Sequence, residues 1–273
     1  NILAVTFTNK AAEEMRHRVA AVLGVEFEIP RPYAWGSFSK QPHIGTFHSI
    51  CTQILRREIE HTGFNKQFVI YDDSDQLSLV KECFSKLGLS DKTYSPKSFQ
   101  WAINSVKSWV KKPGEVMTSD AFERVYELYQ TELLKSNAID FGEIILGTYK
   151  LLHREPELLE KYQNIYQYIH VDEYQDTNRA QYLLIHLLSA KHRNLCVVGD
   201  EDQSIYKWRG ADIRNILDFE KDYPDAQVIK LEQNYRSTQT IVTASSHLIG
   251  QNSSRKPKKL WTENESGELI VRV

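Results

Sequence analysis

Two adjacent carboxylates follow a short, largely apolar run in the second half of the chain. The run covers residues 168–171, and Asp172 and Glu173 come directly after it. An Asp at the carboxyl end of a buried strand can hold Mg²⁺ beside nucleotide phosphates, because this hard cation prefers oxygen ligands. The neighbouring Glu can orient or deprotonate an attacking water. Taken alone, however, such a pair is more typical of a solvated turn.

A second polar string, residues 198–210, follows another apolar run and favours the catalytic interpretation. It places Gln203 in a polar turn and then offers two aromatic faces and a guanidinium from Tyr206, Trp208 and Arg209. Aromatic faces suit a single-stranded nucleic acid, because every base has a face on which a ring can stack.

Two further observations make the acidic pair more than a solvated turn. The pair continues as the longer string Asp-Glu-Tyr-Gln-Asp-Thr-Asn over residues 172–178. A third string, residues 231–238, ends an apolar run with Tyr235 and Arg236 before a new helical pattern.

These strings resemble the motifs of superfamily 1 DNA helicases of the UvrD/PcrA/Rep type. Residues 7–12 are similar to that family's motif Ia, and residues 45–49 are similar to its next DNA-contacting motif. The motifs stand in the family's order between residue 1 and about residue 262, which chance agreement does not explain.

The resemblance implies a role for each matching residue of the nucleotide site. Asp172 would hold Mg²⁺, Glu173 would activate water, and Gln203 would sense the γ-phosphate of ATP. Tyr235 would stack on adenine, while Arg236 would reach the γ-phosphate from across a domain cleft. An arginine on a separately moving domain stabilises the transition state only when the cleft closes, which couples hydrolysis to motion.

The resemblance also implies a track for single-stranded DNA. Its residues would be Phe7, Thr46, His48, Tyr206, Trp208 and Arg209. Three of these have a structural alternative. Phe7 and Trp208 could be core residues, and His48 could be a hydrogen-bonded residue at a helix start.

The implied fold is α/β, with a RecA-like parallel sheet of the P-loop NTPase type. Domain 1A would comprise residues 1–49 and 161–230, and a helical insertion, domain 1B, would occupy residues 50–160. Residues 231–273 would begin a second RecA-like domain, 2A.

The apolar patterning must supply the elements that position these residues. Four apolar runs alternate with helical patterns, which predicts buried strands in parallel βαβ units. They cover residues 2–7, 168–171, 195–198 and 228–231. The proline-rich and glycine-containing residues 25–43 predict a loop.

Helical patterns fill the remaining stretches. The first helix is predicted to stop at Gly24, and a second to end at Gly88. Between residues 50 and 160 we expect helices and no strand. One of these should start at Ser95-Pro96 and stop at Pro113-Gly114, and another should start at Asp140.

One family feature is absent from the sequence. The phosphate-binding pattern G-x-x-x-x-G-K-S/T does not occur, and the G-x-x-x-x-G at residues 142–147 is followed by Thr148 and encloses an apolar helix face. Because the chain opens with Asn1 at motif Ia, upstream of which the family carries this loop, we expect a fragment. We expect the chain as given to hydrolyse ATP negligibly.

Composition excludes several other classes of protein. The chain has 273 residues, 41% hydrophobic and 26% charged, with a net charge of −2, which is typical of a folded globular protein. Cys51, Cys83 and Cys196 form no disulfide or zinc pattern, which fits a reducing cytoplasm. No apolar run is long enough to span a membrane, and no signal segment opens the chain.

Two clusters of basic side chains are predicted to face solvent. The first shares a helix and its end with Trp101 and Trp109, and it contains Lys97, Lys107, Lys111 and Lys112. It could touch the duplex backbone, but a solvated helix face is the more typical arrangement. The second surrounds Pro257 and predicts an exposed loop. It contains Arg255, Lys256, Lys258 and Lys259.

The function implied is that of part of an ATP-dependent 3′–5′ DNA helicase, acting in repair or replication restart. Its cofactors would be ATP and Mg²⁺, and its partners would be single-stranded DNA and single-strand/duplex junctions, with no membrane and with protein partners unknown. Two alternatives remain open: the helicase part of an AddA/RecB-like helicase-nuclease, and a non-catalytic DNA-binding remnant. The intact Glu173, Gln203 and Arg236 disfavour the remnant.

Overall fold

The computed structural model describes residues 1–24, 41–252 and 255–271, so most of the predicted loop over residues 25–43 lies outside the described residues. A four-stranded parallel sheet forms the centre of one part of the molecule, in the order β2-β1-β5-β6. Its strands are β1 (Ile2–Thr6), β2 (His43–Thr46), β5 (Tyr168–Val171) and β6 (Leu195–Val197). The predicted α/β class with a parallel sheet is thereby confirmed.

The sheet joins two stretches that lie far apart in the sequence. In β1, Val5 pairs with Gly45 of β2 on one side and with Val171 of β5 on the other. Residues 3–5 are all buried, as is typical of a central strand covered on both faces. Three of the four predicted strands are therefore present. The strand β2 was not predicted as one.

Helices cover the sheet and begin at caps that the sequence supplies. They include α1 (Asn9–Leu23), α2 (Phe47–Glu58), α8 (Pro156–Ile165) and α9 (Arg179–Ser189). The Thr8 side chain accepts a hydrogen bond from Ala11 N at the start of α1, and Gly24 ends that helix with φ 64°. Glycine adopts this left-handed conformation without steric cost, so the predicted stop is confirmed.

A mainly helical body lies between β2 and β5 in the sequence. Its elements are η1 (Ile59–His61), β3 (Val69–Tyr71), α3 (Asp73–Lys86), α4 (Pro96–Trp109), α5 (Pro113–Val116), α6 (Asp120–Lys135), β4 (Ala138–Asp140) and α7 (Phe141–Arg154). Strands β3 and β4 form a small parallel pair, so the expectation of no strand between residues 50 and 160 was wrong. Three-residue strands are too short for a periodic pattern to reveal.

Helix α4 shows where local signals succeed and where they stop. The Ser95 side chain accepts from Ser98 N, and Pro96 occupies the first turn, as predicted. The helix ends at Val110, which has φ 53°, before the predicted stop at residues 113–114. Those two residues instead begin α5, because proline is as favourable at a helix start as it is unfavourable within a helix.

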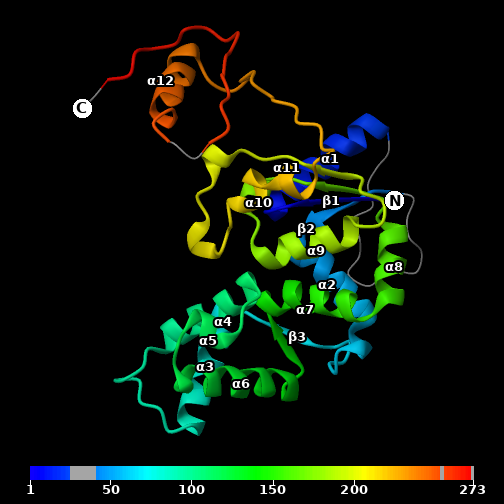
Figure 1. Ribbon diagram of the computed structural model, residues 1–273, viewed down its shortest axis with the longest axis vertical. Helices are drawn as coiled ribbons and strands as arrows, with labels where there is room; N and C mark the ends of the chain where they lie inside the picture. Colours follow the sequence, from blue (N-terminus) through cyan, green and yellow to red (C-terminus); the bar gives the residue numbers. More distant parts are fainter. Residues whose placement is uncertain (25–40, 253–254, 272–273) are drawn as a thin grey trace.

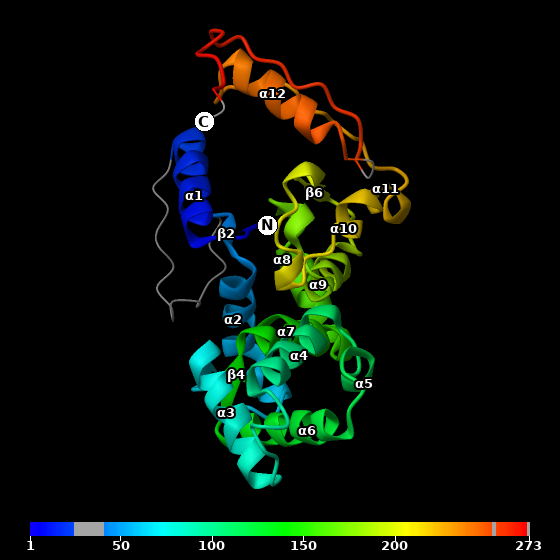
Figure 2. The same cartoon turned by 90° about the vertical axis from the view of Figure 1, so that its left-hand side faces the viewer.

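The chain after β6 consists of short helices, extended segments and one longer helix. These helices are η3 (Glu201–Gln203), η4 (Lys207–Arg209), α10 (Arg214–Leu217), α11 (Phe219–Asp222) and α12 (Gln239–Ile249). One more short helix, η2 (Tyr174–Asp176), lies earlier, between β5 and α9. Both views place α12 at one end of the molecule and helices α3 and α6 at the other, with the parallel sheet between them (Figure 1, Figure 2).

The predicted strand over residues 228–231 was wrong. Val228, Ile229 and Leu231 are 52, 79 and 80% exposed, and the segment belongs to no strand. The nearest pairing is a single bridge between Gln233 and Trp261. Apolar side chains alone do not make a strand, because its backbone groups need a neighbouring strand to accept and donate hydrogen bonds.

Within the described residues, no helix is long and apolar enough to cross a membrane.

Candidate functional site

The carboxyl edge of the parallel sheet gathers most of the residues singled out from the sequence. Phe7 follows β1, Thr46 ends β2, Asp172 follows β5, and the turn that holds Gln203 follows β6. Because all four strands run in the same direction, their carboxyl ends meet along one edge. Ligands of open α/β sheets bind outside this edge.

Asp172 stands at the centre of this edge with little compensation for its charge. Its backbone N–H donates to Val5 O at 2.9 Å, and its Oδ2 accepts from Thr6 Oγ1 at 3.4 Å. Burial raises the pKa of Asp172, and the charge of Glu173 raises it further. No lysine or arginine among the described residues forms an ion pair with either carboxylate. A cation beside them would relieve this repulsion.

The acidic pair fits Mg²⁺ better than a metal held by protein alone. The part of the chain that the structure describes contains no group of three or more His, Cys, Asp or Glu side chains that could hold a metal ion. Protein-bound Mg²⁺ commonly takes only one or two carboxylates and completes its shell with water and substrate phosphates. Asp172, whose carboxylate oxygens accept only one side-chain hydrogen bond, at 3.4 Å, among the described residues, matches that donor set.

Glu173 has an unusual backbone conformation, and its carboxylate is hydrogen-bonded to Gln175, a residue for which the sequence predicted no role. The φ of Glu173 is 52°, in the left-handed region. Gln175 donates from Nε2 to Glu173 Oε2 at 2.8 Å and accepts from Asp200 N at 3.0 Å. Gln175 is 1% exposed, so it links the end of β5 to the turn after β6. Its place within the string of residues 172–178 was the only sequence signal for it.

Gly199 leaves the space that this link requires. A Cβ at Gly199 would lie 2.6 Å from Gln175 Oε1 and 3.2 Å from Tyr174 N. Side-chain carbons do not approach so closely, so only glycine permits the turn after β6 to reach Gln175.

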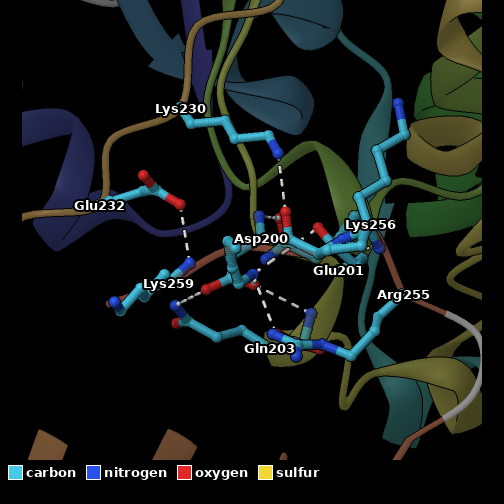
Figure 3. Close-up of polar contacts among 12 residues, drawn as sticks. Asp200, Glu201, Gln203, Lys230, Glu232, Arg255, Lys256 and Lys259 are labelled. Carbon is cyan, nitrogen blue, oxygen red and sulfur yellow. Dashed lines mark hydrogen bonds and ion pairs between the residues drawn. The ribbon is translucent and has the colours of Figure 1, made fainter. Parts of the chain in front are cut away.

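Gln203 directly follows residues 200–202, which we call the acidic turn, and its side chain faces solvent. Its Nε2 donates to Asp200 Oδ2 at 2.8 Å, and the side chain is exposed. Arg255 reaches the same turn from the C-terminal part of the chain (Figure 3). Lys258 forms an ion pair with Asp202 of this turn at 3.0 Å. The side chains of Arg255 and Lys258 are only 16% and 17% exposed, so the prediction of an exposed loop there was wrong for these two.

Tyr235 and Arg236 lie in the extended segment between α11 and α12. The Tyr235 hydroxyl donates to Gln233 Oε1 at 2.7 Å, and the Arg236 backbone N–H donates to Asn234 Oδ1 at 3.0 Å. Tyr235 is 78% exposed. In the described residues, their hydrogen bonds stay within this short segment, which leaves the phenol ring and the guanidinium available to a ligand.

Three aromatic rings and one guanidinium form a continuous group beside the acidic edge. The rings of Phe7 and Tyr206 stack at 5.5 Å, and Trp208 lies 6.3 Å from Tyr206. The Arg209 guanidinium carbon lies 4.7 Å from the centroid of the Trp208 ring. Trp208 is 68% exposed, so it is not a core residue. Phe7 is half-buried.

Thr46 and His48 differ from the exposed aromatic group. Thr46 is buried and caps α2, where its Oγ1 accepts from Ser49 N at 3.2 Å. His48 meets Phe141 edge to face at 5.6 Å, and burial lowers its pKa despite a hydrogen bond with the Phe141 backbone. Phe141 is 47% exposed, an aromatic residue beside the edge that the sequence placed only on a helix face.

The turn that carries Trp208 packs against α4. Gly210 has φ 89°, and a Cβ there would lie 3.2 Å from Ser108 Cβ and 3.4 Å from Trp109 Nε1. Lys107 on the same helix is fully buried and pairs with Asp140 at 2.7 Å and Glu143 at 3.1 Å. The prediction of a solvated basic face on α4 was therefore wrong for Lys107.

Comparison with known proteins gives this arrangement a family. The family model of the UvrD/REP helicase N-terminal domain matches residues 1–224. The chain is 51% identical to the ATP-dependent DNA helicase PcrA of Bacillus subtilis (strain 168) and 49% identical to that of Staphylococcus aureus (strain Mu50). Each match covers 99% of this chain and 36% of the relative. The chain thus spans about a third of the length of these relatives, and it belongs to the UvrD/REP helicase family.

Proposed function

We propose that this chain forms part of an ATP-dependent DNA helicase that moves 3′ to 5′ on single-stranded DNA and unwinds duplex DNA. One observation carries the proposal: the aromatic group and the acidic pair share one edge of one sheet. Phe7 follows β1, and Asp172 follows the adjacent strand β5. A base stacked on the aromatic group would lie beside the site where phosphate is cleaved.

In this proposal each residue of the acidic edge has one task. Asp172 holds Mg²⁺, which supplies charge neutralisation at the β- and γ-phosphates. Glu173 orients and deprotonates the attacking water, and Gln203 donates its amide to the γ-phosphate. The hydrogen bond from Gln175 to the Glu173 carboxylate supports the task of Glu173, because it restrains that carboxylate.

Tyr235 and Arg236 supply the second wall of the nucleotide site. Tyr235 stacks on adenine, and Arg236 reaches the γ-phosphate when the cleft closes. The exposure of Tyr235 and the local hydrogen bonds of the Tyr235–Arg236 pair support a site that is completed by movement. We infer that residues 1–49 and 161–230 form domain 1A, residues 50–160 domain 1B, and residues 231–273 the beginning of domain 2A.

The DNA track runs over the aromatic group, with Trp208 and Tyr206 stacking on bases and Arg209 meeting phosphate. Thr46 and His48 contribute from the start of α2, through backbone groups rather than through a free threonine hydroxyl, since that hydroxyl caps the helix. Single-strand/duplex junctions are the proposed substrate, and DNA repair or replication restart in the cytoplasm is the proposed setting.

The test uses a longer protein that carries this chain together with a G-x-x-x-x-G-K-S/T loop. Unwinding is measured on duplexes with a 3′ or a 5′ single-stranded tail, with ATP and Mg²⁺. We expect unwinding of the 3′-tailed duplex only, and DNA-stimulated release of phosphate. Unwinding from 5′ tails would reject the direction. DNA binding without any nucleotide turnover would favour the non-catalytic remnant, and nuclease activity would favour the AddA/RecB-like alternative.

A further inference from the structure

Ion pairs connect the acidic turn after β6 to the basic segment, by which we mean residues 255–259. Arg255 binds Asp202 through two hydrogen bonds, at 3.0 Å from Nε and 2.7 Å from a terminal nitrogen. Lys258 forms ion pairs with Asp200, with Glu201 at 3.7 Å and with Asp202 at 3.0 Å. These contacts join residues 200–202 to residues 255–258, and α12 lies between the two segments in the sequence.

These ion pairs are largely shielded from solvent. The side chains of Arg255 and Lys258 are 16 and 17% exposed, and those of Glu201 and Asp202 are 9% exposed. Ion pairs in such surroundings are screened by salt much less than pairs on the open surface. Burial alone would raise the pKa of Asp202, but the hydrogen bonds from Arg255 and Lys258 outweigh burial and lower it.

The other side of the basic segment is bonded to the residues just before Tyr235 and Arg236. The backbone N–H of Lys259 donates to Glu232 Oε1 at 2.7 Å. Trp261 N donates to Glu232 O at 3.0 Å, and Asn234 N donates to Trp261 O at 2.7 Å. Hydrogen bonds therefore join residues 259–261 to residues 232–234, which directly precede the Tyr235–Arg236 pair.

The acidic turn has its own link to the sheet edge. Asp200 accepts from Gln203 on Oδ2 at 2.8 Å, while its backbone N–H donates to Gln175, which also holds Glu173. A chain of polar contacts thus runs from Glu173 through Gln175 and Asp200 to Lys258. These contacts connect the ion pairs of Lys258 to Glu173 on one side of the candidate nucleotide site. The hydrogen bond of Lys259 connects the basic segment to the residues before Arg236 on the other side.

We propose that Arg255 and Lys258 are positioning residues, whose ion pairs with the acidic turn set where Arg236 stands relative to Glu173 and Gln203. The proposal rests on the proposed function for the role of Arg236, but the placement itself is a property of this chain. The basic segment acts as an electrostatic latch between the sheet edge and residues 232–236.

The placement is tested by a distance measurement on the 273-residue chain. Spin labels go on Cys196, which is exposed on β6, and on Leu248→Cys, whose position on α12 is 77% exposed; Cys51 and Cys83 are buried. We expect one narrow distance distribution for the labelled parent. Arg255→Gln combined with Lys258→Gln should broaden it. The matched control is Lys221→Gln, which removes an exposed ion pair with Asp218 and should leave it unchanged.

Charge reversal separates positioning from loss of folding. In a Lys258→Gln background, Arg255→Asp should broaden the distribution. Adding Asp202→Arg should narrow it again, because the bidentate pair is rebuilt with opposite polarity and no lysine faces the new arginine. Circular dichroism checks that each variant is folded. An unchanged distribution in the folded Arg255→Gln/Lys258→Gln variant, or no recovery on reversal, overturns the latch.

The consequence for the reaction is tested in a helicase that carries this chain and a phosphate-binding loop. In the Lys258→Gln background, Arg255→Asp should lower kcat of DNA-stimulated ATP hydrolysis by about 10- to 100-fold, the range for a misplaced catalytic group, with KM for ATP nearly unchanged. The reversed pair should restore kcat. An unaltered kcat in Arg255→Asp rejects the positioning role. Absence of turnover in the parent helicase would reject the proposed function instead, while the distance measurement still decides the latch.

Discussion

Phe7 and Tyr206 stack at 5.5 Å with 20° between their ring planes, and they do so across the end of another strand. Phe7 follows β1, Tyr206 lies in the chain after β6, and β5 runs between these two strands. The strand that they bridge is the one that ends in Asp172 and Glu173. A base that displaces or extends this stack would therefore act directly on the edge that holds the acidic pair.

The 273-residue chain should release phosphate from ATP at a negligible rate, even with single-stranded DNA present. The sequence contains no G-x-x-x-x-G-K-S/T loop, so the β- and γ-phosphates lack a backbone cradle and a lysine. A coupled phosphate-release assay on the purified chain checks this. Robust turnover would mean that another part of the chain positions the phosphates.

In a helicase that carries this chain and the missing loop, Glu173→Gln should lower kcat by about 100-fold or more, the range for loss of a general base. Nucleotide affinity should remain, because Gln175 Nε2 can still donate to the amide oxygen that replaces the carboxylate. Steady-state ATP hydrolysis and equilibrium binding of a fluorescent nucleotide give the two quantities. Weak binding with a normal kcat would instead make Glu173 a binding residue.

Trp208→Ala should weaken binding of single-stranded DNA by about 1 to 3 kcal/mol with little dependence on base sequence. In Trp208→Ala, the slope of log affinity against log salt concentration should hardly change. In Arg209→Ala, this slope should become shallower by about one unit if the guanidinium binds a phosphate. Fluorescence anisotropy at several salt concentrations measures both. Trp101→Ala is the matched control, since Trp101 is 52% exposed on α4 and outside the stacked group. Equal losses in the two tryptophan variants would reject the stacking assignment.

Lys107→Met should lower the free energy of unfolding by about 3 to 5 kcal/mol, because it leaves Asp140 buried without its cation. Asp140 is 1% exposed, and it also caps α7 by accepting from Glu143 N at 2.8 Å. Urea denaturation checks the loss, and adding Asp140→Asn should recover part of it while keeping the cap. The exposed Lys97→Met on the same helix should change stability by no more than about 0.5 kcal/mol. A similar, small effect of both lysine variants would contradict the burial of this pair.

Asp172→Asn should make the chain more stable at pH 7, and the gain should fade as the pH falls towards 4. Burial, followed by the charge of Glu173, raises the pKa of Asp172 above its ordinary value. The folded state therefore holds this proton more tightly than the unfolded state, and ionising Asp172 as the pH rises destabilises the fold. Thermal unfolding at pH 4, 5, 6 and 7 tests the trend, with the exposed Asp91→Asn as control. If Asp172→Asn raised the stability equally at every pH, the ionisation of Asp172 would not be the cause of the gain.

Much of the local structure was predictable because its determinants lie close together in the sequence. Thr8 and Gly24 mark the ends of α1, and Ser95 with Pro96 marks the start of α4, because caps act on backbone groups within one turn. The buried run of residues 168–171 is a strand of the sheet, with Asp172 and Glu173 at its carboxyl end. The order of the motifs was enough to predict the family.

Only the tertiary structure decided which distant residues face one another. Lys107 looked like its solvated neighbours but lies buried against Asp140, and Arg255 and Lys258 looked like loop residues but grip the acidic turn. Conversely, the apolar residues 228–231 found no neighbouring strand. Caps and periodicity act within a few residues, so they determine local conformation. Burial, ion pairing and strand pairing depend on long-range contacts, and those exist only once the chain has folded.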